Sequence, residues 1–299
     1  MAKFKIKDGV AIIPEGTTVI GRRTFQDCTS LKSITIPESV TEIGNCAFIS
    51  CTSLKNIAIP KSVTEIGDNA FDGCSSLENI TLPESVTSIG WYAFSGCTSL
   101  KNITLPDSVT FLGENAFKGC TSLESITISK SVTRIDHYVF NNCSSLKSIT
   151  IPESVKDIGV GTFRWCSALE SITLPESVTR IGCYAFMGCT SLKNITIPDS
   201  VTRIEQNAFK GCASLKNVAI PGSVREIEEY AFEGCTSLTT VILPVRMKEI
   251  NLTAFYKCPS LSTIYVPAEK TDYYKELLTE KLHDKIVELE PEKRTKVRK

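Results

Sequence analysis

The sequence predicts an α/β repeat solenoid, because leucine, cysteine and phenylalanine each recur along it at one fixed spacing. Each of the three series returns every 23 residues for eleven turns without an insertion. A fixed period of this length is typical of proteins in which one supersecondary unit stacks on the next. The leucines are Leu31, Leu54, Leu77, Leu100, Leu123, Leu146, Leu169, Leu192, Leu215, Leu238 and Leu261; the cysteines run from Cys28 to Cys258, and the phenylalanines from Phe25 to Phe255.

One repeat, residues 31–53, reads LKSITIPESVTEIGNCAFISCTS. Leu31, Ile34 and Ile36 match the L-x-x-L-x-L spacing of a leucine-rich repeat. The two isoleucines point to one face of a short strand, and their neighbours point to the other. Pro37 ends the strand because it cannot donate a hydrogen bond to a sheet. We expect the rest of the repeat to cross the outer side as short strand, 3-10 or helical segments.

We therefore predict a right-handed leucine-rich-repeat superhelix of about 11 rungs. A short parallel sheet is expected on its concave side and a capping helix at its C-terminal end. One repeat cannot enclose its apolar side chains alone, whereas stacked repeats share one continuous core.

The ends of the chain depart from the repeat and define the expected domain boundaries. Residues 1–13 are expected to form an N-terminal cap, and residues 14–267 the solenoid. Residues 268–290 are expected to form a C-terminal cap, with a helix over 269–286 followed by a strand. Residues 291–299 are charged, and we expect them to be disordered.

Composition excludes several classes of partner. Lys plus Arg number 33 and Asp plus Glu number 33, so no net charge attracts nucleic acid. No apolar run approaches the length of a membrane span, so we expect no membrane insertion. The first residues carry no signal-peptide pattern. The chain as written is therefore expected in the cytoplasm, or at the cell surface or secreted if its start was trimmed.

The thirteen cysteines require a separate explanation. A metal site would need clustered ligands, whereas each cysteine of the series stands alone in its turn, and we expect no metal site. Equivalent side chains in stacked turns point the same way, which opposes the dihedral angle of a disulfide. We expect reduced cysteines that fill the core. Cys46 and Cys183 fall outside the series and are expected near the surface as the more reactive thiols.

Catalytic residues are not evident in the sequence. It holds two histidines, His137 and His283, and no phosphate-binding or nucleophile-elbow motif. Most carboxylates recur at a repeated surface position and are expected to be solvated. We predict that the protein is not an enzyme and takes no cofactor.

The string C-x-S-L-x-x-I-x-I-P-x-S-V-x-x-I-G-x-x-A-F-x-x-C is nearly complete in most turns, over residues 8–267. It closely resembles the BspA-like leucine-rich repeat family of bacterial proteins. The resemblance implies the solenoid fold and no shared catalytic residues. It also implies a possible adhesin function, since several members are surface proteins that bind host matrix proteins or other cells.

The outward positions of the predicted sheet are small, polar and nearly identical from turn to turn. Ser33 and Thr35 are typical, and the pattern changes only near the C-terminal end, where Ile242 and Tyr265 replace threonine. Binding hot spots favour Trp, Tyr and Arg, and most of this face has none.

The residues just before each Ala-Phe pair vary most. Tyrosine returns there in every second turn, with asparagine or glycine between. We expect an exposed aromatic stripe that binds a protein partner, and a glycan is the second option. Packing of each tyrosine over the small residue of the neighbouring turn explains the same pattern. The candidate partner-binding residues are Trp91, Tyr92, His137, Tyr138, Trp165, Tyr184 and Tyr230.

The sequence thus favours a non-catalytic protein-interaction scaffold that presents a rigid repeat surface to a protein partner. The alternative is a cell-surface adhesin that binds host matrix protein or glycan. Because both ends of the predicted sheet are capped, we expect a monomer.

Overall fold

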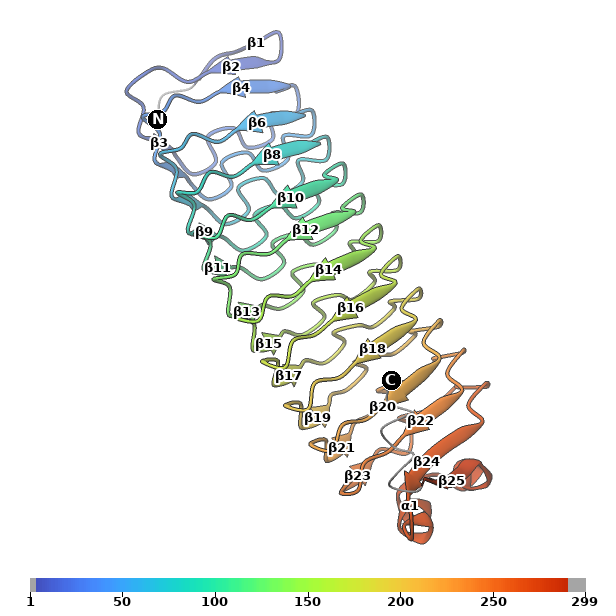
Figure 1. The fold of residues 1–299 in the computed structure, drawn as a ribbon. Helices are drawn as coiled ribbons and strands as arrows, with labels where there is room; N and C mark the ends of the chain where they lie inside the picture. Colours follow the sequence, from blue (N-terminus) through green and yellow to red (C-terminus); the bar gives the residue numbers. More distant parts are fainter. Residues whose placement is uncertain (1–3, 290–299) are drawn as a thin grey trace. The chain divides into compact units, whose positions relative to one another are not determined.

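The structure is a computed structural model that describes residues 4–289. The tail predicted for residues 291–299 lies outside the described residues. The chain forms a parallel β-solenoid with one three-residue or longer strand in each of about twelve turns (Figure 1). It divides into two compact units, Met1–Val155 and Lys156–Lys299.

The first unit carries two sets of strands. The longer strands form what we call the long-strand face: β2 (Val10–Ile12), β4 (Ser33–Thr35), β6 (Asn56–Ala58), β8 (Asn79–Thr81), β10 (Asn102–Thr104), β12 (Ser125–Thr127) and β14 (Ser148–Thr150). Two-residue strands form the short-strand face: β3 (Val19–Ile20), β5 (Glu42–Ile43), β7 (Glu65–Ile66), β9 (Ser88–Ile89), β11 (Phe111–Leu112) and β13 (Arg134–Ile135).

The second unit repeats both sets. Its long-strand face holds β16 (Ser171–Thr173), β18 (Asn194–Thr196), β20 (Asn217–Ala219), β22 (Thr240–Ile242) and β24 (Thr263–Pro267). Its short-strand face holds β15 (Asp157–Ile158), β17 (Arg180–Ile181), β19 (Arg203–Ile204), β21 (Glu226–Ile227) and β23 (Glu249–Ile250). Within each unit, paired strands of the long-strand face, and likewise those of the short-strand face, are parallel and in register by the 23-residue period, as in Asn217↔Thr240.

The predicted count of 11 rungs is one turn too low. The missing turn begins at β2, inside the predicted N-terminal cap, where Val10 pairs with Ser33 and Ile12 with Thr35. This turn lacks the leucine of the series, since Asp8 stands at that position, so the period did not reveal it. The two-residue strand β1 (Ile6–Lys7) pairs antiparallel with β2 and covers its free edge.

The outer side of each turn is simpler than predicted. Two-residue strands are present there, but the segment around each phenylalanine is a series of turns, and the structure assigns no helix between residues 4 and 270. The phenylalanine rings stack instead, as for Phe25 and Phe48, whose centroids lie 5.2 Å apart. Most cysteines of the core series donate a hydrogen bond to a backbone carbonyl, as where Cys51 Sγ donates to Phe25 O at 3.0 Å. All thirteen cysteines are free thiols.

The C-terminal helix is shorter than predicted. Instead of one helix over residues 269–286, α1 (Thr271–Leu277) is followed by a 3-10 helix, η1 (Glu280–Lys285). The backbone of Leu278 is extended, with φ −109° and ψ 153°, which ends α1 while the leucine side chain stays buried. The predicted final strand is present as β25 (Ile286–Leu289), parallel to β24.

Candidate functional site

The predicted stripe residues of the first unit lie at the turns that follow the short-strand face. Trp91 is 54% exposed and Tyr92 is 36% exposed, whereas His137 and Tyr138 are half-buried. The indole of Trp91 leans over Gly113 of the next turn, since a methyl group on Gly113 would meet Trp91 Cδ1 at 2.6 Å.

In the second unit Trp165 is 45% exposed and lies over Gly188, where an added methyl group would meet Trp165 Cε3 at 2.5 Å. Tyr184 and Tyr230 are half-buried, and Lys210 Nζ lies 5.2 Å from the centroid of the Tyr230 ring. In both units, therefore, a tryptophan ring packs over a glycine of the next turn while about half of its surface stays accessible.

The backbone explains why asparagine and glycine alternate with these tyrosines. The residue before every Ala-Phe pair except the last has a positive φ, for example 55° at Asn69, 56° at Tyr92 and 57° at Asn207. Asparagine and glycine adopt this left-handed conformation readily, whereas a bulky residue there is an outlier that costs about 1–3 kcal/mol. The backbone therefore does not require tyrosine at these positions.

Trp165 occupies a second left-handed position, immediately before the core cysteine. Its φ is 62°, and most turns carry glycine there, as at Gly188 and Gly211. The sequence singled out Trp165, but the left-handed backbone beneath it became evident only from the structure.

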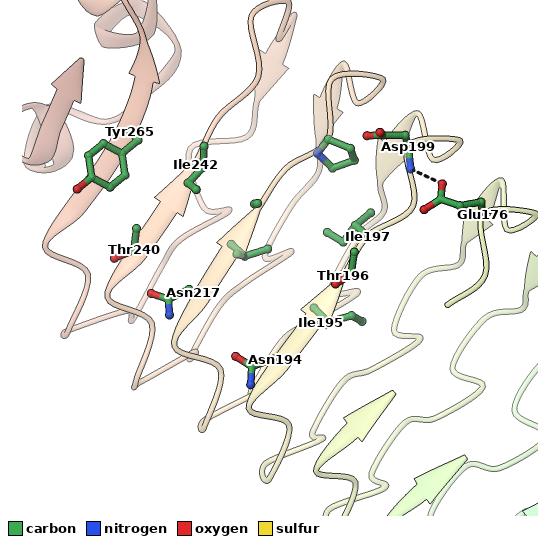
Figure 2. A pocket seen from close by; sticks show the side chains of 13 residues that line it. Glu176, Asn194, Ile195, Thr196, Ile197, Asp199, Asn217, Thr240, Ile242 and Tyr265 are labelled. Atoms are coloured by element: carbon green, nitrogen blue, oxygen red, sulfur yellow. Dashed lines mark hydrogen bonds between the residues drawn. The ribbon is translucent and has the colours of Figure 1, made fainter. Parts of the chain in front are cut away.

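A hollow of about 570 Å³ lies on the long-strand face of the second unit (Figure 2). Its floor combines the amides of Asn194 and Asn217 with the small side chain of Ala219. Ile242 and Tyr265 project beside this floor from β22 and β24, where most turns have threonine. At the rim, the Glu176 carboxylate accepts a hydrogen bond from Asp199 N at 3.2 Å.

The hollow thus places an aromatic ring, an aliphatic side chain, amides and carboxylates around one concavity. The sequence drew attention to Ile242 and Tyr265 but missed Ala219 and the acidic rim. The sequence did contain a signal for the hollow, because Ala219 replaces the usual threonine, as Ala58 does in the first unit. A second hollow, of about 410 Å³, surrounds Ala58, with Lys61 in place of the acidic rim.

The arginines of the short-strand face are paired within the molecule. Arg180 Nε donates to Glu205 at 2.8 Å, and Arg203 Nη1 donates to Glu228 at 3.0 Å. Both glutamates stand where most turns have glycine. These arginines are therefore already neutralised by the following turn.

Cys46 and Cys183 are half-buried, whereas all cysteines of the 23-residue series except Cys28 are buried. Burial and a hydrogen bond to Glu205, at 3.2 Å from Sγ, raise the pKa of the Cys183 thiol to about 11. Because the thiolate is the nucleophile, this raised pKa disfavours reaction of Cys183 at neutral pH. Burial alone would raise the pKa of Glu205, but hydrogen bonds from Arg180 and Cys183 outweigh it, and the pKa is lowered.

The histidines have different surroundings. His283 Nε2 lies 3.0 Å from Lys275 O and 3.1 Å from Leu278 O, so it holds the chain together after α1. His137 lies beside Glu114 and Asp136, and the ligating atoms of these three residues are within 4.8 Å of one another. This group is the one in the described part of the chain with a geometry suited to a metal ion.

The family is decided by comparison with known proteins. The sequence profile of the BspA type leucine rich repeat region, which holds six copies of the repeat, matches residues 9–120, 64–167 and 156–281. The chain belongs to this family. No curated protein matches it at a significant level.

Solved structures agree with membership of the BspA-type family. A leucine-rich repeat protein from Bacteroides ovatus is 29% identical, with 94% of this chain and 92% of that chain covered and a TM-score of 0.50. A leucine rich cell surface protein from Faecalibacterium prausnitzii is also 29% identical, with coverages of 91% and 90% and a TM-score of 0.54. A leucine-rich repeat protein from T. pallidum is 35% identical, with coverages of 54% and 77% and a TM-score of 0.52.

Within residues 4–289, none of the helices has both the length and the apolar character needed to cross a membrane.

Proposed function

We propose that this BspA-type protein is a non-catalytic interaction scaffold that binds a protein segment in the hollow of its second unit. The observation that carries the proposal is the replacement of threonine by Ile242 and Tyr265 beside Ala219. Tyrosine is enriched in binding hot spots, and ligand pockets typically measure about 300–1,000 Å³. Membership of a repeat-scaffold family supports a role without catalysis.

The charges of the hollow indicate the kind of segment that fits. Glu176 and Asp199 at the rim favour a basic side chain, while Tyr265 offers an aromatic face to an apolar or cationic group. The amides of Asn194 and Asn217 are able both to donate and to accept hydrogen bonds from a peptide backbone.

The test is selection from a displayed library of random peptides, using the whole chain as bait. The double variant Ile242→Thr/Tyr265→Thr restores the common residue of the repeat on both strands. We expect selected peptides to bind this variant at least about tenfold more weakly, because a hot-spot residue contributes about 2 kcal/mol or more. Peptides that bind both proteins equally would contradict the hollow as the binding site.

The aromatic stripe is the second surface that we propose for the same function, and it has a matched control. Tyr92→Asn and Tyr184→Asn remove the rings but keep a residue that other turns use in the same left-handed conformation. If the stripe binds a partner, these variants weaken binding while the melting temperature stays within a few degrees. Unchanged binding together with a lower melting temperature would assign the rings to packing alone.

A cell-surface adhesin for host matrix protein or glycan is the alternative, and one comparison favours it. The solved relative from Faecalibacterium prausnitzii is described as a cell surface protein. Labelling of intact source cells with a membrane-impermeant reagent tests this alternative. Labelling of the chain before lysis supports it and directs the screen toward matrix proteins and glycans, whereas labelling only after lysis excludes it.

A further inference from the structure

Three side chains that commonly bind metals meet in the first unit, just beyond strands β11 and β13. They are Glu114, Asp136 and His137, and all three are half-buried. We propose that they form a binding site for a transition-metal dication of the Zn²⁺ type. The site is independent of the hollow in the second unit.

The geometry is close to that of a coordinated ion. The ligating atoms lie within 4.8 Å of one another. With bonds of about 2.1 Å, ligands around a tetrahedral ion lie roughly 3.4 Å apart. Binding would therefore draw these half-buried side chains together by rotation, and water would supply the remaining coordination position.

A cationic group already stands beside two of the ligands. Arg134 Nη2 lies 3.3 Å from Asp136 Oδ1 and 3.3 Å from His137 Nε2. Guanidinium has no hydrogen-bond acceptor, so Nε2 must accept, and its lone pair is directed at a positive charge. Metal coordination likewise requires a neutral imidazole, whose lone pair would then be directed at the ion instead of at Arg134. The Arg134 guanidinium thus occupies the place that a bound metal ion would take, and the ion would displace it.

The third ligand is the carboxylate of Glu114. Within the described part of the chain, no hydrogen bond or ion pair engages this carboxylate. It lies on the turn before Asp136 and His137, at the position that Trp91 occupies one turn earlier. An ion bound here would therefore link two neighbouring turns.

Comparison with the second unit shows that this arrangement is particular to its turn. Glu205 and Glu228 occupy the repeat position of Asp136, and each is paired with an arginine of the preceding turn. In the turn before Asp136, the position of these arginines is occupied by Phe111, which carries no charge. Asp136 is instead contacted by an arginine of its own turn, with Arg134 Nη2 3.3 Å from Asp136 Oδ1.

The ligand set indicates the class of metal. Imidazole suits Zn²⁺, Cu²⁺, Ni²⁺ and Fe²⁺, whereas Mg²⁺ and Ca²⁺ prefer oxygen ligands alone. One imidazole and two carboxylates therefore favour a borderline transition metal such as Zn²⁺ over the alkaline-earth ions.

Titration calorimetry of the whole chain with ZnCl₂ tests the site. We expect one saturable event that MgCl₂ does not reproduce. His137→Ala and Asp136→Asn should weaken it at least about tenfold, and Glu114→Gln to a smaller extent. Arg134→Ala should tighten binding, because the competing guanidinium is removed.

Glu228→Gln is the matched control, since Glu228 shares the repeat position of Asp136 but has no histidine beside it. It should leave zinc binding unchanged. A thermal shift by Zn²⁺ that disappears in His137→Ala provides a second readout and shows that each variant is folded. No binding to the wild type, or binding that survives His137→Ala and so belongs to the cysteines, would overturn the proposal.

Discussion

Single residues carry two kinds of information in this repeat. The core series could be predicted from the sequence, because Phe, Cys and Leu at a fixed period have few explanations other than stacking. The left-handed positions could not, because Tyr92 and Trp165 are residue types that seldom adopt a positive φ. The sequence signal for this conformation was the residue at the same position of a neighbouring turn, which is Asn69 for Tyr92 and Gly188 for Trp165.

The ion pair between Arg180 and Glu205 yields a prediction about pH. Because the pKa of Glu205 is lowered from its usual value of 4.5 in the folded chain, folding favours the ionised carboxylate. The resulting stability is fully present above about pH 4.5 and is lost as the pH falls through the folded pKa. Since the pair is partly exposed to solvent, the effect is at most about 1 kcal/mol.

Urea unfolding of the wild type and Glu205→Gln at neutral and acidic pH measures this effect. We expect the difference in unfolding free energy between the two proteins to shrink as the pH falls below 4.5. Glu170→Gln, which removes an exposed pair with Lys193, should show little effect at either pH. A difference that grows at acidic pH would show that the sign is wrong.

At the scale of elements, strands were predicted well and the terminal helix less well. Alternating apolar residues ended by proline locate the strands of the long-strand face, except that Ser129 replaces proline after β12. The spacing of Tyr274, Leu278 and Leu282 predicts one helix, but the extended backbone of Leu278 divides it into α1 and η1. Periodicity does not register this break, because the break depends on where β25 must pair with β24.

The seven-residue α1 depends on tertiary contacts, since so short a helix is not stable alone. Tyr274 is fully buried, and its hydroxyl donates to Pro244 O. We propose that α1 acts as a cap through this residue. Tyr274→Ala should cost about 3–5 kcal/mol of unfolding free energy, and Tyr274→Phe about 1 kcal/mol.

Chemical unfolding of both variants measures these costs. Lys275→Ala, on the exposed side of α1, is the control and should change the midpoint little. Equal midpoints for Tyr274→Ala and the wild type would mean that α1 adds nothing to the stability of the strands beside it.

At the scale of the molecule, the period predicted the solenoid but not the sites on it. Residues one period apart lie side by side, so Glu114 and His137, which are 23 residues apart, could have been paired from the sequence, with Asp136 next to His137. The hollow required more, because its concavity depends on the missing side-chain atoms of Ala219 between Thr196 and Ile242. Such sites arise where one turn departs from the others, and their shape follows only from the stacked structure.

Stacking also determines how the molecule should respond to damage in its core. In a repeat protein, stability is approximately a sum of terms between neighbouring turns. The ring of Phe209 is fully buried between Phe186 and Phe232, with centroids 5.4 Å and 5.2 Å away. Phe209→Ala removes both contacts and should cost about 3–5 kcal/mol.

Because the lost terms belong to the adjacent turns, we expect the effect to be local. Amide hydrogen exchange should show reduced protection in the turns of Phe186, Phe209 and Phe232, and near wild-type protection in β4 to β8 of the first unit. Phe209→Leu, which retains much of the volume, should show the same pattern to a smaller extent. Uniform loss of protection along the whole chain would instead mean that all turns unfold together, because the coupling between turns then exceeds the damage to any one of them.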